Sequence, residues 1–265
     1  MRRFRLTAFM TSFLFAAGVA LTGATNAQAA ATGYVALGDS YSSGVGSGSY
    51  DSASGDCKRS SKAYPALWAA AHSPSSFNFT ACSGARTGDV LSGQLTPLGS
   101  GTGLVSISIG GNDAGFADVM TTCVLNSEAT CLNRINQARA YVTSTLPGNL
   151  DKVYDAIHAK APAAHVVVIG YPRFYKLGGS CIAGLSEAER TAINSAADLL
   201  NTTTAKRAAD HGFTFGDVTT KFSGHEICSG SPWLHSVNWT NIGESYHPTA
   251  AGQSGGYLPV LTSAA

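Results

Sequence analysis

Charged residues are scarce in this sequence and make up only 12% of the chain. The 17 lysines and arginines nearly balance the 16 aspartates and glutamates, so the net charge is close to zero. Proteins that hold nucleic acid or anionic head groups by charge carry an excess of basic residues. The composition therefore gives no support for a nucleic-acid partner.

Motifs for metals and phosphates are missing as well. The sequence has no Cys-x-x-Cys pair and no two histidines at the spacing of zinc ligands. The glycine-rich run 44–48 is not followed by the Lys-Ser/Thr pair of a phosphate-binding loop. We therefore expect neither a metal nor a cofactor, and we interpret residues 44–61 as a loop at the rim of a site.

Beyond residue 30, no apolar run is long enough to cross a bilayer. The first thirty residues combine an arginine-rich start, an apolar run from about Leu6 to Leu21, and the small residues of Ala27-Gln28-Ala29. This order is typical of a cleaved secretory signal peptide. We expect residues 1–30 to be the signal peptide and the protein to be secreted, with a slightly negative mature chain. Residues 31–265 are long enough for a single domain.

The sequence contains six cysteines, all in the expected mature part: Cys57, Cys82, Cys123, Cys131, Cys181 and Cys228. An even number in an exported chain indicates three disulfides. Fifteen pairings are possible for six cysteines. Sequential pairing, 57 with 82, 123 with 131 and 181 with 228, closes the smallest loops and is the one we favour.

Strands and helices alternate along the mature chain. Apolar and β-branched runs predict strands at 34–38, 78–81, 104–109, 165–169 and 213–215. Helices are expected at 64–71, 114–123, 132–159 with an interruption at Pro147, from the Ser186-x-x-Glu189 capping box to about Gly212, and from about Thr249. Such alternation with nearly all-apolar strands predicts an α/β fold with a central parallel sheet covered by helices on both faces.

Three candidate site positions follow three of these strands. Ser40 comes directly after the first strand, where the sequence changes to turn residues, and a serine fixed there suits a nucleophile. Gly84 and Asn112 follow the second and third strands. Sites in open parallel sheets form at the carboxyl ends of the strands, so the three positions should converge.

A serine nucleophile needs a base within hydrogen-bond reach. Of the seven histidines, His247 is distinctive because Pro248 fixes the backbone after it and a helix follows at once. An ester transition state also needs donors for the developing oxyanion. The backbone N–H groups of Ser40 and Gly84 and the side-chain amide of Asn112 could supply them.

Four blocks of the sequence occur in a characteristic order: Gly38-Asp39-Ser40-Tyr41-Ser42, Ser83-Gly84-Ala85, Gly110-Gly111-Asn112-Asp113 and His247-Pro248. They resemble the signature blocks of the GDSL, or SGNH, hydrolase family, and the chain is most similar to its secreted actinomycete (Streptomyces-type) lipases and phospholipases. Those enzymes also have three sequentially paired disulfides. The resemblance implies a three-layer α/β/α sandwich, Ser40 as nucleophile and His247 as base. It also implies an oxyanion hole made by Ser40, Gly84 and Asn112.

The sequence departs from the family before the histidine. Most members place an aspartate three residues earlier to orient the ring, whereas this chain has Glu244. Relatives without the aspartate use a backbone carbonyl, for which Ser245 is placed. A carbonyl can fix the tautomer of His247, although it stabilises the imidazolium less than a carboxylate would. We favour the Ser245 carbonyl, with the Glu244 carboxylate as the rival.

These observations favour a secreted serine ester hydrolase, a lipase or esterase that acts on lipid esters through an acyl-Ser40 intermediate and works as a monomer. Phospholipase A and carbohydrate acetyl esterase are alternatives on the same machinery. A non-catalytic sugar- or peptide-binding module is an alternative of another class, but it has no reason to keep all four blocks together. Aromatic residues that could line an acyl groove are Phe116, Tyr171, Phe174, Trp233 and Trp239.

Overall fold

The central element of the fold is one parallel sheet. In the computed structural model, which describes residues 1, 32–178, 181 and 184–265, its strands lie in the order β2-β1-β3-β4-β5. The strands are β1 (Gly33–Gly38), β2 (Phe77–Phe79), β3 (Thr102–Ser108), β4 (His165–Ile169) and β5 (Thr214–Gly216). Each predicted strand is present, and the bounds agree within two residues. The expected signal peptide lies outside the described residues, apart from Met1.

The three central strands form the middle of the core. Leu37 of β1 pairs with Ile107 of β3, which in turn pairs with Val168 of β4, and all three side chains are buried. Strands that are covered on both faces read as continuous apolar runs, because neither face meets water. The all-apolar character that predicted the parallel sheet therefore has this physical origin.

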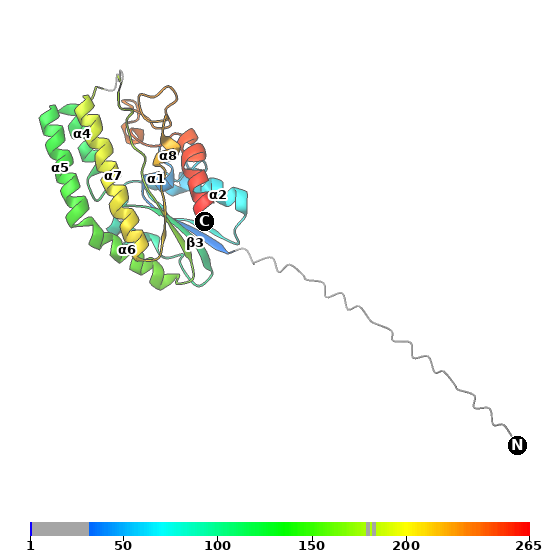
Figure 1. The fold of residues 1–265 in the computed structure, drawn as a ribbon. Coiled ribbons are helices and arrows are strands. Elements are labelled where there is room, and N and C mark those ends of the chain that lie inside the picture. Colours follow the sequence, from blue (N-terminus) through cyan, green and yellow to red (C-terminus); the bar gives the residue numbers. More distant parts are fainter. Residues whose placement is uncertain (2–31, 179–180, 182–183) are drawn as a thin grey trace. The chain divides into compact units, whose positions relative to one another are not determined.

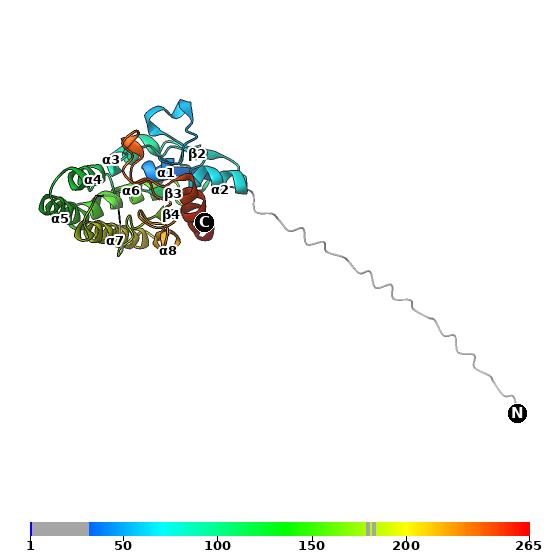
Figure 2. The ribbon, with the colours of Figure 1, turned by 90° about the horizontal axis from the view of Figure 1, so that it is seen from above.

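Helices cover both faces of the sheet, which gives the three-layer α/β/α sandwich (Figure 1; Figure 2). One layer contains α4 (Phe116–Leu125), α5 (Glu128–Ser144), α6 (Leu146–Lys160) and α7 (Glu187–Asp210). The other contains α2 (Tyr64–His72) and α9 (Leu258–Ala264), which contact each other. Shorter turns are α1 (Ser40–Ser43), η1 (Ser52–Cys57), α3 (Thr87–Asp89), η2 (Val90–Gln94), α8 (Thr219–Phe222), η3 (Ile242–Glu244) and η4 (Gly252–Tyr257).

Two predicted helices differ in detail from the structure. The expected helix 132–159 is divided into α5 and α6, and Pro147 lies in the first turn of α6, where its missing N–H costs nothing. The C-terminal helix expected from about Thr249 begins at residue 250 and passes through the π-helical turn η4 into α9. The short helices α1, α3 and α8 carry too little periodicity to be predicted.

Helix α7 fixes the loop that follows β4. The expected capping box is present, since Ser186 Oγ accepts from the Glu189 N–H and the Glu189 carboxylate accepts from the Ser186 N–H. Asn194 and Asn201, two helical turns apart on α7, accept from and donate to the backbone of residues 171–175. This loop therefore has a fixed course where it approaches the end of the sheet.

Three disulfides brace the loops: Cys57–Cys82, Cys123–Cys131 and Cys181–Cys228. This is the sequential pairing that the sequence favours. The first ties the loop after β1 to the loop after β2, and the second ties the end of α4 to α5. Each closed loop is expected to add about 2–4 kcal/mol to the free energy of unfolding. Across the described ranges, no helix is both long and apolar enough to span a membrane.

Candidate active site

Ser40 begins a short helical turn directly after β1. Asp39 caps this turn, because its carboxylate accepts a hydrogen bond from the Tyr41 N–H at 3.0 Å. The turn is entered through Gly38, whose φ of +121° is open only to glycine, and an added Cβ there would lie 2.4 Å from the Ser108 carbonyl oxygen. The end of the strand and the cap together hold Ser40 at the edge of the sheet.

His247 lies against Ser40. Its Nε2 atom is 2.7 Å from Ser40 Oγ, and its Nδ1 atom is 3.0 Å from the Ser245 carbonyl oxygen. A carbonyl oxygen only accepts, so Nδ1 carries the proton and Nε2 is left with its lone pair directed at the serine hydroxyl. This is the tautomer that can take a proton from the hydroxyl group.

The Glu244 carboxylate is directed elsewhere. It accepts a hydrogen bond from the Tyr50 hydroxyl at 2.7 Å, and that hydroxyl accepts from the Gly46 N–H at 2.8 Å. Toward the histidine, Glu244 offers its backbone carbonyl, which accepts from the His247 N–H at 3.2 Å. The structure thus brings the Ser245 carbonyl to the imidazole ring and uses the Glu244 side chain to bind the 44–50 loop.

Burial lowers the pKa of His247 to about 4, while its hydrogen bond to the Ser245 carbonyl acts in the opposite direction. Electrostatic interactions with His235 and Lys58 contribute to this lowering of the pKa. The ring is therefore neutral at neutral pH. A neutral imidazole beside a serine hydroxyl has the protonation state that a general base requires.

Gly84 and Asn112 lie beside Ser40 and His247, and all four line one groove. The Asn112 amide donates to the Ala85 carbonyl oxygen at 3.0 Å, which fixes the orientation of the amide. Next to this contact, the carboxylate of Asp113 accepts from both the N–H and the hydroxyl group of Thr87. The loops after β2 and β3 are therefore bound to each other, and the expected convergence of the strand ends is present.

Asp39 has a second set of contacts that the sequence did not reveal. Its carboxylate accepts from Ser108 Oγ at 2.8 Å and from the Tyr171 hydroxyl at 2.5 Å. Burial raises the pKa of Asp39 to about 6, against the effect of these hydrogen bonds. An aspartate before a helical turn is a recognisable N-cap. Its partners lie on β3 and on the loop after β4, too far away in sequence to be found from a local pattern.

Tyr41 connects the serine turn to the histidine segment. Its hydroxyl donates to the Tyr246 carbonyl oxygen at 2.7 Å across a sequence separation of 205 residues. Tyr246 has φ +65°, a left-handed conformation that costs a bulky residue free energy and persists only when its surroundings hold it. The residue beside Ser40 thus holds the peptide beside His247.

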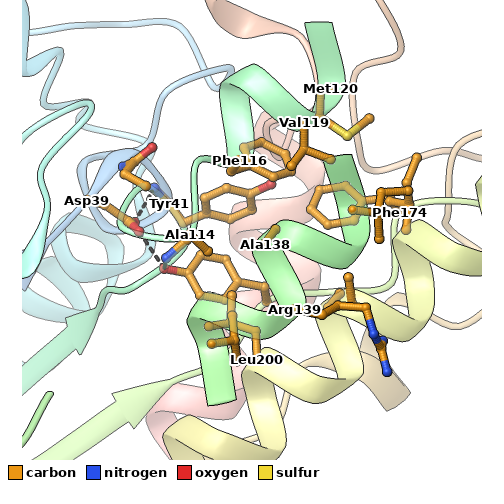
Figure 3. A pocket seen from close by; sticks show the side chains of 18 of the residues that line it. Asp39, Tyr41, Ala114, Phe116, Val119, Met120, Ala138, Arg139, Phe174 and Leu200 are labelled. Atoms are coloured by element: carbon orange, nitrogen blue, oxygen red, sulfur yellow. Dashed lines mark hydrogen bonds between the residues drawn. The ribbon is translucent and has the colours of Figure 1, made fainter. Parts of the chain in front are cut away.

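Two cavities meet at Ser40. The open groove is lined by Ser40, Ser83, Gly84, Asn112, Phe116, Ala117, Met120, Thr121, Val124, Leu125, Val237, Trp239, Ile242, Gly243, Ser245, Tyr246 and His247. The inner pocket lies between α4, α5 and α7 and is lined mainly by apolar side chains of these helices, with Asp39 at one end and the Arg139 guanidinium directed away (Figure 3). Ser40, Asn112, Phe116 and Met120 line both.

The aromatic residues predicted to line an acyl groove are distributed between the open groove and the inner pocket, with one exception. Phe116 lines both cavities, Tyr171 and Phe174 line the inner pocket, and Trp239 lines the groove. Trp233 lines neither, because its indole stacks on the His225 ring with centroids 3.6 Å apart. In the described part of the chain, no group of three His, Cys, Asp or Glu side chains could hold a metal ion.

A serine hydroxyl bonded to a neutral histidine, beside converging amide donors on an α/β sandwich, is the arrangement of a serine hydrolase. Over residues 36–254 the sequence matches the GDSL-like lipase/acylhydrolase family, and the chain belongs to that family of carboxylic ester hydrolases.

Its relatives agree with this assignment. Over 269 residues, the chain is 78% identical to Lipase 1 of Streptomyces coelicolor, and the match covers 100% of each chain. Two solved structures are 72% identical and cover 89% of this chain and 100% of their own. They are a phospholipase A1 from Streptomyces albidoflavus, with a TM-score of 0.88, and an extracellular lipase from Streptomyces rimosus, with a TM-score of 0.87.

Proposed function

We propose that the protein hydrolyses carboxylic esters of lipids with Ser40 as the nucleophile and His247 as the general base. His247 Nε2 takes the hydroxyl proton as Ser40 Oγ attacks the ester carbonyl, and then passes it to the departing alcohol. The same nitrogen next takes a proton from water as the water oxygen attacks the acyl carbon. It returns this proton to Ser40 Oγ as the bond between Oγ and the acyl carbon breaks, which releases the fatty acid and restores the serine. The observation that carries this proposal is the 2.7 Å contact between Nε2 and Oγ, with Nδ1 held by the Ser245 carbonyl.

The donors beside Ser40 would stabilise the transition state. The N–H groups of Ser40 and Gly84 and the amide of Asn112 are suited to bind the oxyanion that forms on the carbonyl oxygen. The amide keeps one N–H on the Ala85 carbonyl oxygen, so the second N–H is left for the substrate. The Ser245 carbonyl holds His247 in the required tautomer, as the sequence comparison with the family implies.

The lining of the two cavities favours a lipid substrate. The inner pocket opens at Ser40 and is walled by aliphatic and aromatic side chains such as Val119, Phe174 and Leu200, which suit an acyl chain. Among the described residues that line the groove, none is Asp, Glu, Lys or Arg. An esterase that removes acetyl groups from carbohydrate would leave the inner pocket unused. The names of the relatives, two lipases and a phospholipase A1, point to lipid esters too.

Export is part of the same proposal. The basic and apolar N-terminal segment has the pattern of a signal peptide, and the six cysteines form disulfides, which persist in oxidising surroundings. The relative from Streptomyces rimosus is named as extracellular. We infer that residues 1–30 direct secretion and that residues 31–265 act outside the cell as a monomer.

The test is the hydrolysis of p-nitrophenyl esters from acetate to palmitate by the mature chain, Ser40→Ala and His247→Gln. Each variant should lose activity by at least about 10⁴-fold, because the first lacks the nucleophile and the second leaves the serine without its base. Ser92→Ala and His158→Ala, which change exposed residues of the same types, should retain full activity. If Ser40→Ala were as active as the parent, the assignment of the nucleophile would fail. An optimum at acetate would favour the acetyl esterase.

A further inference from the structure

Three large apolar side chains at the mouth of the groove are unusually exposed. They are Trp239, Leu125 and Ile242, with 72%, 66% and 62% of their surface exposed, and we call them the apolar rim. Across the described ranges beyond Met1, the other exposed large hydrophobic residues are Leu91 and Leu177, at 39% and 43%, and neither lines the groove. Exposed apolar side chains that gather in one place mark an interaction surface.

The rim comes from two distant segments. Leu125 is the last residue of α4, whereas Trp239 lies in the loop before η3 and Ile242 begins η3. More than a hundred residues separate the two segments, yet their side chains line one groove together with Ser40 and His247. The fold therefore keeps these side chains out of the core, although it buries the neighbouring Met120 of α4.

The polar features next to the rim fit a phospholipid surface. The ammonium group of Lys58 is 3.5 Å from the position that a Cβ on Gly243 would occupy, and Gly243 lines the groove next to Ile242. A cation bordering an apolar patch matches the phosphate layer above the acyl chains. Tryptophan is enriched at the membrane–water interface, because its indole ring is amphipathic.

We propose that the apolar rim inserts into the surface of phospholipid aggregates, so that the groove opens directly into the lipid. This inference rests on the proposed function, because an ester hydrolase gains from such docking when its substrate lies within the aggregate. The groove runs from the rim to Ser40, which gives a lipid molecule a path from the surface to the nucleophile without crossing water.

The test uses Ser40→Ala and vesicles of a diether phosphatidylcholine, which has no ester to cleave. Trp239 serves as the reporter, because the other two tryptophans are packed, Trp68 against Tyr34 and His72 and Trp233 against His225. We expect the tryptophan emission to shift to shorter wavelength on adding vesicles, and the shift to vanish when Trp239→Phe is added. An unchanged emission spectrum together with no co-sedimentation would overturn the proposal.

Variants then distinguish vesicle binding through the apolar rim from non-specific adsorption through any exposed apolar side chain. In the Ser40→Ala background, Leu125→Ser, Trp239→Ser and Ile242→Ser together should weaken vesicle binding at least tenfold. The matched control, Leu91→Ser with Leu177→Ser, should leave it unchanged, and Lys58→Gln should weaken it a few-fold. Equal loss in the rim and control variants would contradict the proposal. So would sedimentation velocity showing that the rim closes between two copies of the chain.

A kinetic comparison with Ser40 intact completes the test. The triple rim variant should lose at least tenfold more activity on vesicles of ester phosphatidylcholine than on dissolved p-nitrophenyl acetate. Equal losses of activity on the two substrates would mean that the rim residues act in the chemical step or in folding and not in docking to the vesicle. Rim-dependent binding by Ser40→Ala supports the docking proposal even if no ester is hydrolysed, so failure of the catalytic assignment is recognised separately.

Discussion

Ser40 and His247 are held in place by different means. Ser40 belongs to a set of residues at strand ends, with Gly84 and Asn112, and its position follows from the regular spacing of the parallel strands. His247 lies in a long connection between β5 and the C-terminal helix that contains little regular structure. Its position depends on contacts with other parts of the chain.

Specific hydrogen bonds connect the histidine segment to distant parts of the chain. Tyr41 bonds the Tyr246 carbonyl oxygen, Tyr50 bonds the Glu244 carboxylate, and the backbone of His235 pairs with that of residues 246 and 247. His235 Nε2 also lies 2.7 Å from the Gly46 carbonyl oxygen. One half of the site is therefore fixed by the sheet, and the other half is fixed by side chains of the serine turn and of the loop after it. Substitutions in the second half should therefore impair catalysis without unfolding the protein.

Among changes to the residues that support Ser40 and His247, the largest effect on activity is expected from Tyr41→Phe. This change removes the hydrogen bond that holds the left-handed peptide of Tyr246, so His247 should lose its alignment with Ser40. Misplacement of a catalytic group by about 1 Å costs roughly 100-fold in rate. We expect kcat on p-nitrophenyl butyrate to fall by about 10- to 100-fold with little change in KM.

The matched control for this variant is Tyr154→Phe. Tyr154 is also fully buried, but among the described residues its hydroxyl has no hydrogen-bond partner. It should keep its kcat. A kcat for Tyr41→Phe equal to that of Tyr154→Phe would show that the histidine segment holds its place without the tyrosine.

A smaller effect is expected from pH. His247 must be neutral to act as a base, and its folded pKa of about 4 is below the ordinary value near 6.5. Activity should therefore be constant from pH 7 down to about 5, reach half near pH 4, and fall below that as the ring gains a proton. The measurement is kcat/KM for a soluble ester between pH 3.5 and 8 over times in which the enzyme stays folded.

A rising limb centred at pH 6.5 would mean that the ring is not buried as described. Asp39 has a pKa of about 6 and is in contact with the same turn, so an inflection there needs its own control. An inflection that disappears in Asp39→Asn would belong to Asp39, and one that remains would belong to His247.

The smallest effect is expected from Glu244→Gln. Glutamine keeps an oxygen that can accept from Tyr50, and the Ser245 carbonyl, not the Glu244 side chain, contacts the imidazole ring. We expect kcat to change by less than about threefold. A loss in kcat of about a thousandfold or more, as when an orienting acid is removed, would mean that the Glu244 carboxylate orients His247. It would contradict the proposal that the Ser245 carbonyl does so.

The strand-end half of the site could be predicted from sequence. Ser40, Gly84 and Asn112 follow apolar runs, and the geometry of a parallel sheet brings the ends of such runs together whatever the loops do. His247 was singled out by Pro248 and by the blocks of the family, which also implied the Ser245 carbonyl. The roles of these residues await the measurements above.

The contacts that hold the histidine segment could not be predicted. Tyr41 and Tyr246 are 205 residues apart, and nothing local distinguishes a tyrosine that donates to a distant carbonyl from one that only packs. The Trp-bearing loop shows the same limit. Trp233 and Trp239 looked alike in sequence, but one is stacked on His225 and the other is exposed at the groove. Burial in a loop depends on tertiary packing, which periodicity does not report.

Two glycines of the candidate site, Gly38 and Gly84, differ in how well they would tolerate substitution in a variant library. Two features exclude a side chain at Gly38: its backbone conformation, and the Ser108 carbonyl oxygen with which a Cβ atom would clash. At Gly84 only the φ of +78° disfavours a side chain, since no atom of the described residues beyond its chain neighbours lies within 4 Å of an added Cβ. Asparagine tolerates that conformation better than other residues with a side chain. Diversity is therefore best introduced at position 84, beginning with asparagine, while position 38 is left untouched.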